Sequence, residues 1–461
     1  VYKRQGGGLA RVLGGEVLAP YNYWDPTRVI PETINEFPFF SFLFADLHPH
    51  MIGIPFTLLF LSLTYQLLHP RPVTEQTEEI SPRPPVTVLA TILPVTMPDI
   101  GRWLAIPFVL GSLAAINTWD LPTYLGLVVA AFMLARFRSS LAPLKTRGIG
   151  MILLAGLLFA AAVLVGAYLF FWPFFSNYQP PAETGIGWVT TRTPLTLHLK
   201  IWGFFLFVLI TWLLVSLLAG TAAPSLLRFT RLLLRWWNVS PHLWQIYRAV
   251  VKNQSDLYQL GVWGIVVVFL LSVALVIFGF RVPALLFPLV VLSLLLLFRR
   301  EVAPATAYLN LLTFTGLLVL LGVEFFFLRD FLGGGDYYRM NTLFKFYIQV
   351  WVMFGVAVAV ALPQLWEQAW RWSLPVQLVW RTAAMILLVA GLVYPVFGTR
   401  TRVDDRFPGE DNRPPIGTLD GLAYMTTGVF EWPAGNPINL RYDYEAVSYT
   451  HLRAHETNPC I

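Results

Sequence analysis

The feature that most constrains the fold is a series of long apolar runs separated by short polar segments. Ten runs of roughly 16–25 residues can be read along the chain, and a helix of about 20 apolar residues crosses a bilayer. Because lipid offers no partner to backbone N–H and C=O groups, such runs favour helices. The sequence predicts an all-α, polytopic transmembrane helix bundle. The predicted spans are 51–68, 100–117, 120–136, 148–172, 201–219, 260–280, 283–298, 306–325, 343–363 and 376–395.

Composition supports the same class. The chain is 56% hydrophobic and only 13% charged, about half the charged share of an ordinary soluble protein. Its net charge of +6 comes largely from basic residues gathered on one side of the predicted membrane. The basic balance therefore indicates contact with membrane lipid, and we expect no nucleic-acid partner.

The distribution of basic residues predicts the orientation. One set of alternate loops carries sixteen Lys and Arg residues, whereas the other carries six. Basic loops remain in the cytoplasm, so we expect a multi-pass protein of the cell membrane with the poorer set outside. The segments predicted to lie on the outer face are 6–50, 117–122, 173–200, 326–342 and the tail after 395.

The two ends of the chain look foreign to the fold. Residues 1–5 and 447–461 resemble translated sequencing-adapter read-through, and the single cysteine, Cys460, lies in the second of them. We expect a fragment of a longer protein in which thiol chemistry plays no part. It would comprise an external loop over 6–50, a helix bundle over 51–395 and the start of an external region over 396–446.

A cluster of ionisable residues precedes the first predicted span. It consists of Glu36, Asp46, His48 and His50. The last three alternate in sequence, so an extended chain would point them to one face. Such a face suits acid/base chemistry near neutral pH or a divalent cation, whereas helix capping is the structural alternative. We take Asp46, His48 and His50 as candidate catalytic residues and Glu36 as a candidate substrate-binding residue, and we assign no metal ligand.

A polar turn interrupts the next long apolar run. Residues 117–124 include Asn117, Trp119, Asp120 and Pro122. Proline breaks the helix, and short polar side chains can satisfy the freed backbone groups. The segment is either a plain hairpin turn or part of a site shared with the first cluster. On the second interpretation Asp120 is catalytic, and Asn117 and Trp119 bind substrate.

A glycine-rich turn followed by a polar helical stripe is the third signal. Gly333–Gly335 precede Asp336, Arg339, Asn341 and Lys345. Cations at this depth suit a phosphate at the membrane surface, although basic side chains also extend toward the interface for structural reasons. The candidate substrate-binding residues of this segment are Asp336, Arg339, Asn341 and Lys345.

These motifs resemble the YYY family of uncharacterised polytopic membrane proteins. The resemblance rests on residues 34–51, 117–124, 336–349 and 419–425. That family is in turn distantly similar to the C-superfamily glycosyltransferases, multi-spanning enzymes that use lipid-phosphate sugar donors. The resemblance implies a fold of that kind and a polyprenyl-phosphate sugar as partner. In such enzymes an acid in the first external loop commonly serves as the base, and we expect that loop to lie upstream of residue 1.

The leading hypothesis is therefore a membrane-embedded glycosyltransferase that moves a sugar from a polyprenyl-phosphate donor to an acceptor on the outer face. A divalent cation is left open as a cofactor. The alternative is a multi-spanning transporter or flippase for a lipid-linked or polar substrate, because charged residues and broken helices also mark transport paths. The charges gather at one face and do not run through the midplane, which favours the enzyme.

Overall fold

A computed structural model gives the fold, which is mostly helical. It describes residues 21–45, 47–69, 100–139, 146–179, 185–219, 245, 256–330, 335–406, 422–430 and 437–446. The chain divides into two compact units. The larger comprises residues 27–388, and the smaller combines 1–26 with 389–461.

A helix forms over each predicted apolar run. Two short strands, which lie in the segments before the helices at Leu195–Leu218 and Met340–Gln368, pair with each other. The helices are α2 (Pro38–Phe44), α3 (Pro49–Gln66), α5 (Ile100–Ile116), α6 (Asp120–Ser139), α7 (Thr146–Phe170), α8 (Trp172–Asn177), α9 (Leu195–Leu218), α12 (Asp256–Ile277), α13 (Arg281–Leu297), α14 (Pro304–Gly322), α15 (Met340–Gln368) and α16 (Leu374–Arg406). The strands are β1 (Gly185–Trp188), β2 (Phe326–Arg329), β3 (Val429–Phe430) and β4 (Ile438–Asn439). Short 3-10 helices cover Asp25–Thr27, Ala369–Arg371 and Ala423–Thr426.

Each of the ten predicted runs coincides with a helix, but the helices differ in their capacity to cross a membrane. Six are long and apolar enough by length and composition: α6, α7, α9, α14, α15 and α16. Helices α5, α12 and α13 contribute shorter apolar stretches. A multi-pass membrane protein is thus supported, while a count of ten spans stays a prediction.

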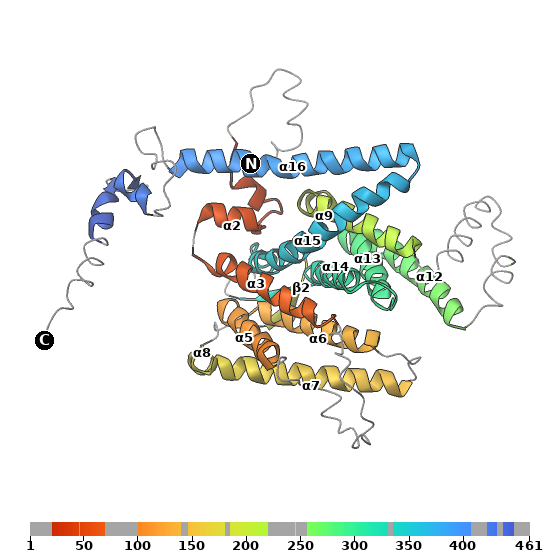
Figure 1. The fold of residues 1–461 in the computed structure, drawn as a ribbon. Coiled ribbons are helices and arrows are strands. Elements are labelled where there is room, and N and C mark those ends of the chain that lie inside the picture. The colour runs from red at the N-terminus through yellow and green to blue at the C-terminus, as the bar shows by residue number, and fades with distance from the viewer. Residues whose placement is uncertain are drawn as a thin grey trace. The chain divides into compact units, whose positions relative to one another are not determined.

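The larger unit is a bundle of packed helices (Figure 1). Helix α14 packs between α13 and α15, and α7 packs along α5 and α6. The α9–α15 contact centres on Trp202, whose fully buried ring packs on Tyr347 and Trp351 with centroids 5.1 and 5.5 Å away. At Gly316 of α14 a Cβ atom would collide with the ring of Phe354 of α15. Only glycine permits that close approach of the two helices.

The ends of the helices form two chemically distinct surfaces of this unit. At one end, Arg138 of α6 donates to the carbonyls of Arg299 (3.1 Å) and Val302, and Arg299 donates to the carbonyl of Ser216 at 2.6 Å. These cations lie at the carboxyl ends of α6, α9 and α13, where the helix dipole favours them. Among the described residues, Arg138 and Arg299 thus lie together at this end of the bundle, which we call the basic end.

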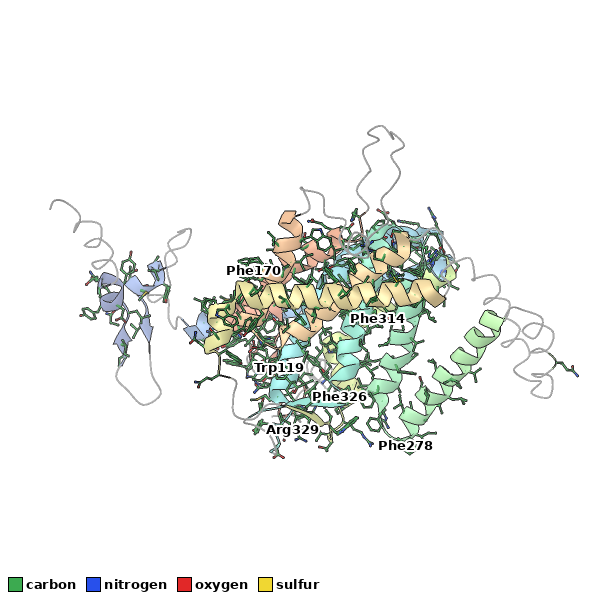
Figure 2. All side chains as sticks on the ribbon, turned by 90° about the horizontal axis from the view of Figure 1, so that it is seen from below. Trp119, Phe170, Phe278, Phe314, Phe326 and Arg329 are labelled. Atoms are coloured by element: carbon green, nitrogen blue, oxygen red, sulfur yellow. The ribbon has the colours of Figure 1, made fainter. Side chains whose placement is uncertain are left out.

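The opposite end of the bundle is closed by the β1–β2 pair. The two strands are antiparallel, with Gly185 opposite Arg329 and Trp188 opposite Phe326. Arg192, which follows β1, donates to the carbonyl of Phe278 after α12. Figure 2 shows Phe278, Phe326 and Arg329 toward the same lower edge of the view. The amino ends of α3, α6 and α15 meet at this end, which we call the site end.

The smaller unit has its own aromatic contacts. Tyr394 of α16 donates to the carbonyl of Tyr23 at 3.2 Å, and Arg402 donates to the Tyr23 hydroxyl at 3.0 Å. The adapter-like segments 1–5 and 447–461 and the turn 331–334 lie outside the described residues.

The two-ended arrangement makes a prediction about sidedness. Ser139 ends α6 at the basic end, and the exposed Ile186 lies in β1 at the site end. With Cys460 replaced by serine, Ser139→Cys and Ile186→Cys should react with a membrane-impermeant maleimide from opposite sides of sealed vesicles, because α7 separates them. We expect Ile186→Cys to react from the outside. Reaction of both from the same side would contradict the topology.

Candidate functional site

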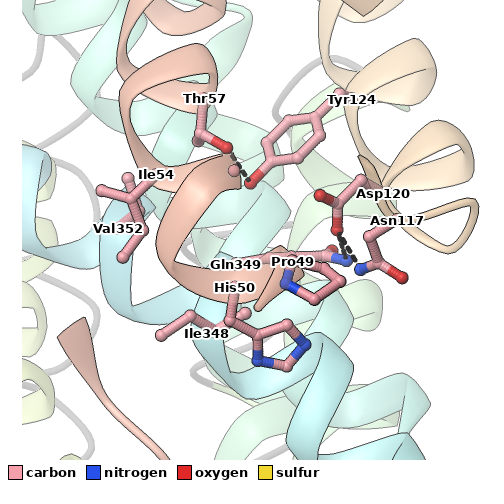
Figure 3. A pocket seen from close by; sticks show the side chains of 11 residues that line it. Pro49, His50, Ile54, Thr57, Asn117, Asp120, Tyr124, Ile348, Gln349 and Val352 are labelled. Carbon is pink, nitrogen blue, oxygen red and sulfur yellow. Dashed lines mark hydrogen bonds between the residues drawn. The ribbon is translucent and has the colours of Figure 1, made fainter. Parts of the chain in front are cut away.

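A narrow cavity lies at the site end where the amino-terminal turns of α3 and α6 meet α15 (Figure 3). Its wall includes His50 of α3, Asp120 of α6 and Gln349 of α15, all buried. The volume of the cavity is about 10 Å³, close to the least that one water molecule requires. The cavity therefore fits a hydroxyl group or a water molecule rather than a whole sugar.

Asp120 is the anionic group of this cavity. Its Oδ1 accepts hydrogen bonds from Asn117 Nδ2 at 2.8 Å and from Gln349 Nε2 at 2.7 Å. Gln349 Nε2 also donates to the carbonyl of Trp119 at 3.2 Å. Among the described residues, none donates to Oδ2. Two donors thus fix the carboxylate while one oxygen remains available for a hydroxyl in the cavity.

Lys345 supplies a cation beside this carboxylate. It lies one helical turn before Gln349 on α15, so both side chains share a face. Its ammonium is half-buried and within electrostatic reach of Asp120, Asp330 and His50. Within the described part of the chain, Lys345 forms no hydrogen bond and no ion pair. Partial burial of an unpaired charge costs free energy. An unpaired, half-buried cation is therefore typical of a site that binds an anionic ligand.

A second group of polar residues combines Glu36, His48 and His50. Glu36 Oε2 lies 3.5 Å from His48 Nε2, and one possible ligand atom from each residue lies within 4.8 Å of the other two. The ring of Phe344 packs against both imidazoles, with its centroid 3.9 Å from His50 and 6.1 Å from His48. These three residues have the donor types and the proximity to hold a metal ion.

Local backbone geometry brings the three residues together. His48 is the residue before α3, with extended backbone angles, and His50 lies in the first turn of that helix. Short helix α2 returns the chain so that Glu36 faces His48, and it ends at Ala45 in the left-handed region with φ 59°. That conformation costs roughly 1–2 kcal/mol for a residue other than glycine. The backbone thus passes from extended angles at His48 into the first turn of α3, as the capping alternative expects.

The buried carboxyl of Glu36 is the electrostatic centre of this group. Burial raises the pKa of Glu36, and the neighbouring His48 and a hydrogen bond from Ser41 oppose that rise. Ser41 Oγ donates to Glu36 Oε2 at 3.3 Å. A carboxylate that is costly to charge gains more from a bound cation than an exposed one does.

The other sequence-predicted residues fall in different surroundings. Asn341 donates to Asp330 Oδ2 at 2.6 Å and is partly buried. Asp336 is exposed, and Trp119 is partly exposed next to the cavity. Asp46 lies outside the described residues. The structure therefore brings Glu36, His48, His50, Asn117, Asp120 and Lys345 to one end of the bundle, with Asn341 linked to them through Asp330, whose charge reaches Lys345.

Arg339 occupies a site that sequence analysis did not anticipate. Its guanidinium forms a buried ion pair with Glu324, with Nη2 3.1 Å from Oε1. It also donates to Thr193 Oγ1 and to the carbonyls of Thr191 and Val323 at 2.9–3.1 Å. Both charged side chains are less than 5% exposed. A phosphate-binding role for Arg339 stays a prediction, and the geometry gives this residue a bracing role between α14, α15 and the segment after β1.

Two residues of these networks were missed. Glu324 is the single acid at the end of the apolar run 306–325, and a lone acid in such a place calls for a cationic partner. Gln349 lies one helical turn after Lys345, and its bond to Asp120 crosses from α15 to α6. The first could have been found from the cost of burying a charge. The second required knowledge of which helices touch.

The buried ion pair makes a prediction about stability. Arg339→Met leaves Glu324 buried without its cation and should destabilise the protein by about 3–5 kcal/mol, the usual effect of breaking such a pair. Combining it with Glu324→Leu should recover much of the loss, because an apolar pair of similar volume carries no charge to bury. Denaturant unfolding of the detergent-solubilised protein measures both changes. Equal stability of Arg339→Met and the wild type would contradict the structural role.

Comparisons with known proteins identify the family and nothing finer. No curated protein and no solved structure matches the chain. The model of one family matches residues 3–354, which is most of the chain. Its description agrees with the expected family of uncharacterised membrane proteins, and the chain belongs to the family described as Uncharacterized membrane protein (DUF2298).

Proposed function

We propose that this protein is a membrane-embedded glycosyltransferase that moves a sugar from a polyprenyl-phosphate donor to an acceptor hydroxyl at the outer face. The observation that carries the proposal is the arrangement of Lys345 beside Asp120 at the site end. A half-buried cation without a partner among the described residues and a fixed carboxylate with one available oxygen lie within electrostatic reach of each other. Resemblance to the C-superfamily glycosyltransferases points to the same chemistry.

Lys345 is the residue we assign to the donor phosphate. Its position near the start of α15 puts the ammonium near one end of an apolar helix, where the head group of a lipid phosphate would lie. Electrostatic attraction there would be stronger than in water because the surroundings have a lower dielectric constant. Arg339 has its charge paired with Glu324, and both of its Nη atoms donate to Glu324, Thr193 and backbone carbonyls, so Lys345 is the better candidate.

Asp120 is the residue we assign to the acceptor. A hydroxyl in the narrow cavity would donate its proton to Oδ2, while Asn117 and Gln349 hold Oδ1 in place. As the acceptor oxygen bonds to the anomeric carbon, the bond from that carbon to the phosphate oxygen breaks. The electron pair stays on the leaving phosphate, whose added charge Lys345 offsets. Proton, sugar and charge are thus all accounted for.

A transporter or flippase is the competing function. Polar groups of the described part that could bind a substrate cluster at the site end, and the opposite end holds basic side chains bonded to helix carbonyls. A transport path would need accessible polar groups through the middle of the bundle. The distribution therefore favours chemistry at one face.

The role of Lys345 can be tested by transfer assays. Lys345→Met removes the charge but keeps the length of the side chain. Transfer from a radiolabelled polyprenyl-phosphate hexose in proteoliposomes should fall by about 10²–10³, the usual effect of losing one electrostatic donor. Lys345→Arg should recover part of the rate because it restores the charge with a different geometry.

Lys200 offers a matched control for that experiment. It is exposed in the first turns of α9, so Lys200→Met should leave transfer unchanged. Full activity in Lys345→Met would remove this residue from the site. Movement of the labelled lipid across sealed vesicles without a covalent product would instead support the transporter.

The role of Asp120 has a separate test. Asp120→Asn keeps the size of the side chain but removes its capacity to accept the acceptor proton, so transfer should fall by about 10²–10⁴, the range for general-base catalysis. Binding of unglycosylated polyprenyl phosphate, measured by scintillation proximity, should be retained because Lys345 remains. Loss of binding and transfer together would show that Asp120 serves the donor instead.

A further inference from the structure

We propose that Glu36, His48 and His50 form a binding site for one divalent transition-metal ion. The inference rests on their geometry and on a buried imidazole nitrogen of His50 that has no partner among the described residues, and it does not depend on the proposed transfer reaction.

The donor set is the first argument. Two imidazoles and one carboxylate suit Zn²⁺ and neighbouring metals such as Fe²⁺ and Mn²⁺, and they leave positions open for water or substrate. Mg²⁺ and Ca²⁺ prefer sets made of oxygen alone. The class of ion is therefore a borderline transition metal, for which Zn²⁺ is the practical probe.

Separations among the donor atoms are the second argument. Zinc-to-ligand bonds of about 2.0–2.2 Å place the ligands of a tetrahedral ion roughly 3.3 Å apart. The observed 3.5 Å between Glu36 Oε2 and His48 Nε2 is close to that value. The ligand atoms of all three residues lie within 4.8 Å of one another. A small rotation of the His50 side chain would therefore bring the three atoms to the separations of a tetrahedral site.

The state of His50 is the third argument. This residue is only 6% exposed, and its Nδ1 has no hydrogen-bond partner in the described part of the chain. A buried polar atom without a partner costs free energy, and a metal ion would remove that cost. Phe344 packs on the ring, which fixes the imidazole beside the other two donors.

The surroundings provide a fourth argument. The site lies between a strained turn at Ala45 and the cavity wall that His50 shares with Asp120. Strain of this kind persists where the surrounding structure requires it, often at ligand sites. The charge of Lys345 reaches His50 and that of Arg28 reaches Glu36, and the carboxylate of Glu36 offsets their repulsion of a metal ion.

Metal content provides the test. The protein, purified without a histidine tag and stripped with a chelator, is titrated with Zn²⁺, and bound metal is measured by mass spectrometry. We expect about one ion per chain, as well as visible absorption bands of tetrahedral coordination when Co²⁺ replaces Zn²⁺. Millimolar Mg²⁺ should not compete. Absence of stoichiometric Zn²⁺ from the wild type overturns the proposal.

Variants decide which residues bind the ion. Glu36→Gln, His48→Ala and His50→Ala should each weaken Zn²⁺ binding by more than about 100-fold. Even the loss of a residue that only hydrogen-bonds to a metal ligand lowers metal affinity by about 10–100-fold. His69→Gln alters an exposed histidine outside the trio and should bind as the wild type does. If His50→Ala fails to fold, His48→Ala tests the site at a partly exposed position. Wild-type affinity in the His48→Ala variant would overturn the assignment.

Discussion

The larger unit depends on one constraint: polar groups placed among apolar helices must find partners within the protein. Water in the bilayer core is too scarce to satisfy them, and each unsatisfied group costs several kcal/mol. In the Arg339–Glu324 pair each buried charge lies beside its counter-charge, and the guanidinium is also bonded to Thr193 and backbone carbonyls. These contacts join α14 and α15 to the segment between β1 and α9, and so they set the shape of the site end.

The same constraint separates structural from functional polar residues. Arg339 and Lys345 are only six positions apart, and the sequence made both candidate phosphate ligands. Arg339 has its charge neutralised by Glu324, whereas Lys345 has no ion pair among the described residues. His50 and Asp120 follow the same reasoning, because each keeps one polar atom without a described partner near the narrow cavity. Two such atoms beside one cavity, with a cation next to them that has no ion pair in the described part of the chain, indicate a site.

Sequence patterns predicted the helices well because the signal is local. A run of apolar residues long enough to cross a bilayer forms a helix whatever its neighbours are, so α6, α9 and α15 lie where they were expected. Pairings between distant segments could not be read in this way. Glu36 reaches His48 only because α2 returns the chain, and Gln349 reaches Asp120 only because α15 lies against α6. Helix α3 begins at Pro49, closer to the capping alternative than to an extended chain, and the ring centroids of His48 and His50 lie 5.5 Å apart.

An experimental structure with polyprenyl phosphate in the membrane mimetic would show whether Lys345 binds the phosphate of a lipid-linked donor. We expect density for the phosphate within roughly 4 Å of Lys345 Nζ, the distance of an ion pair, with the prenyl chain extending along the apolar helices. Density for the phosphate at another part of the bundle, with the Lys345 side chain in contact with lipid tails, would contradict it.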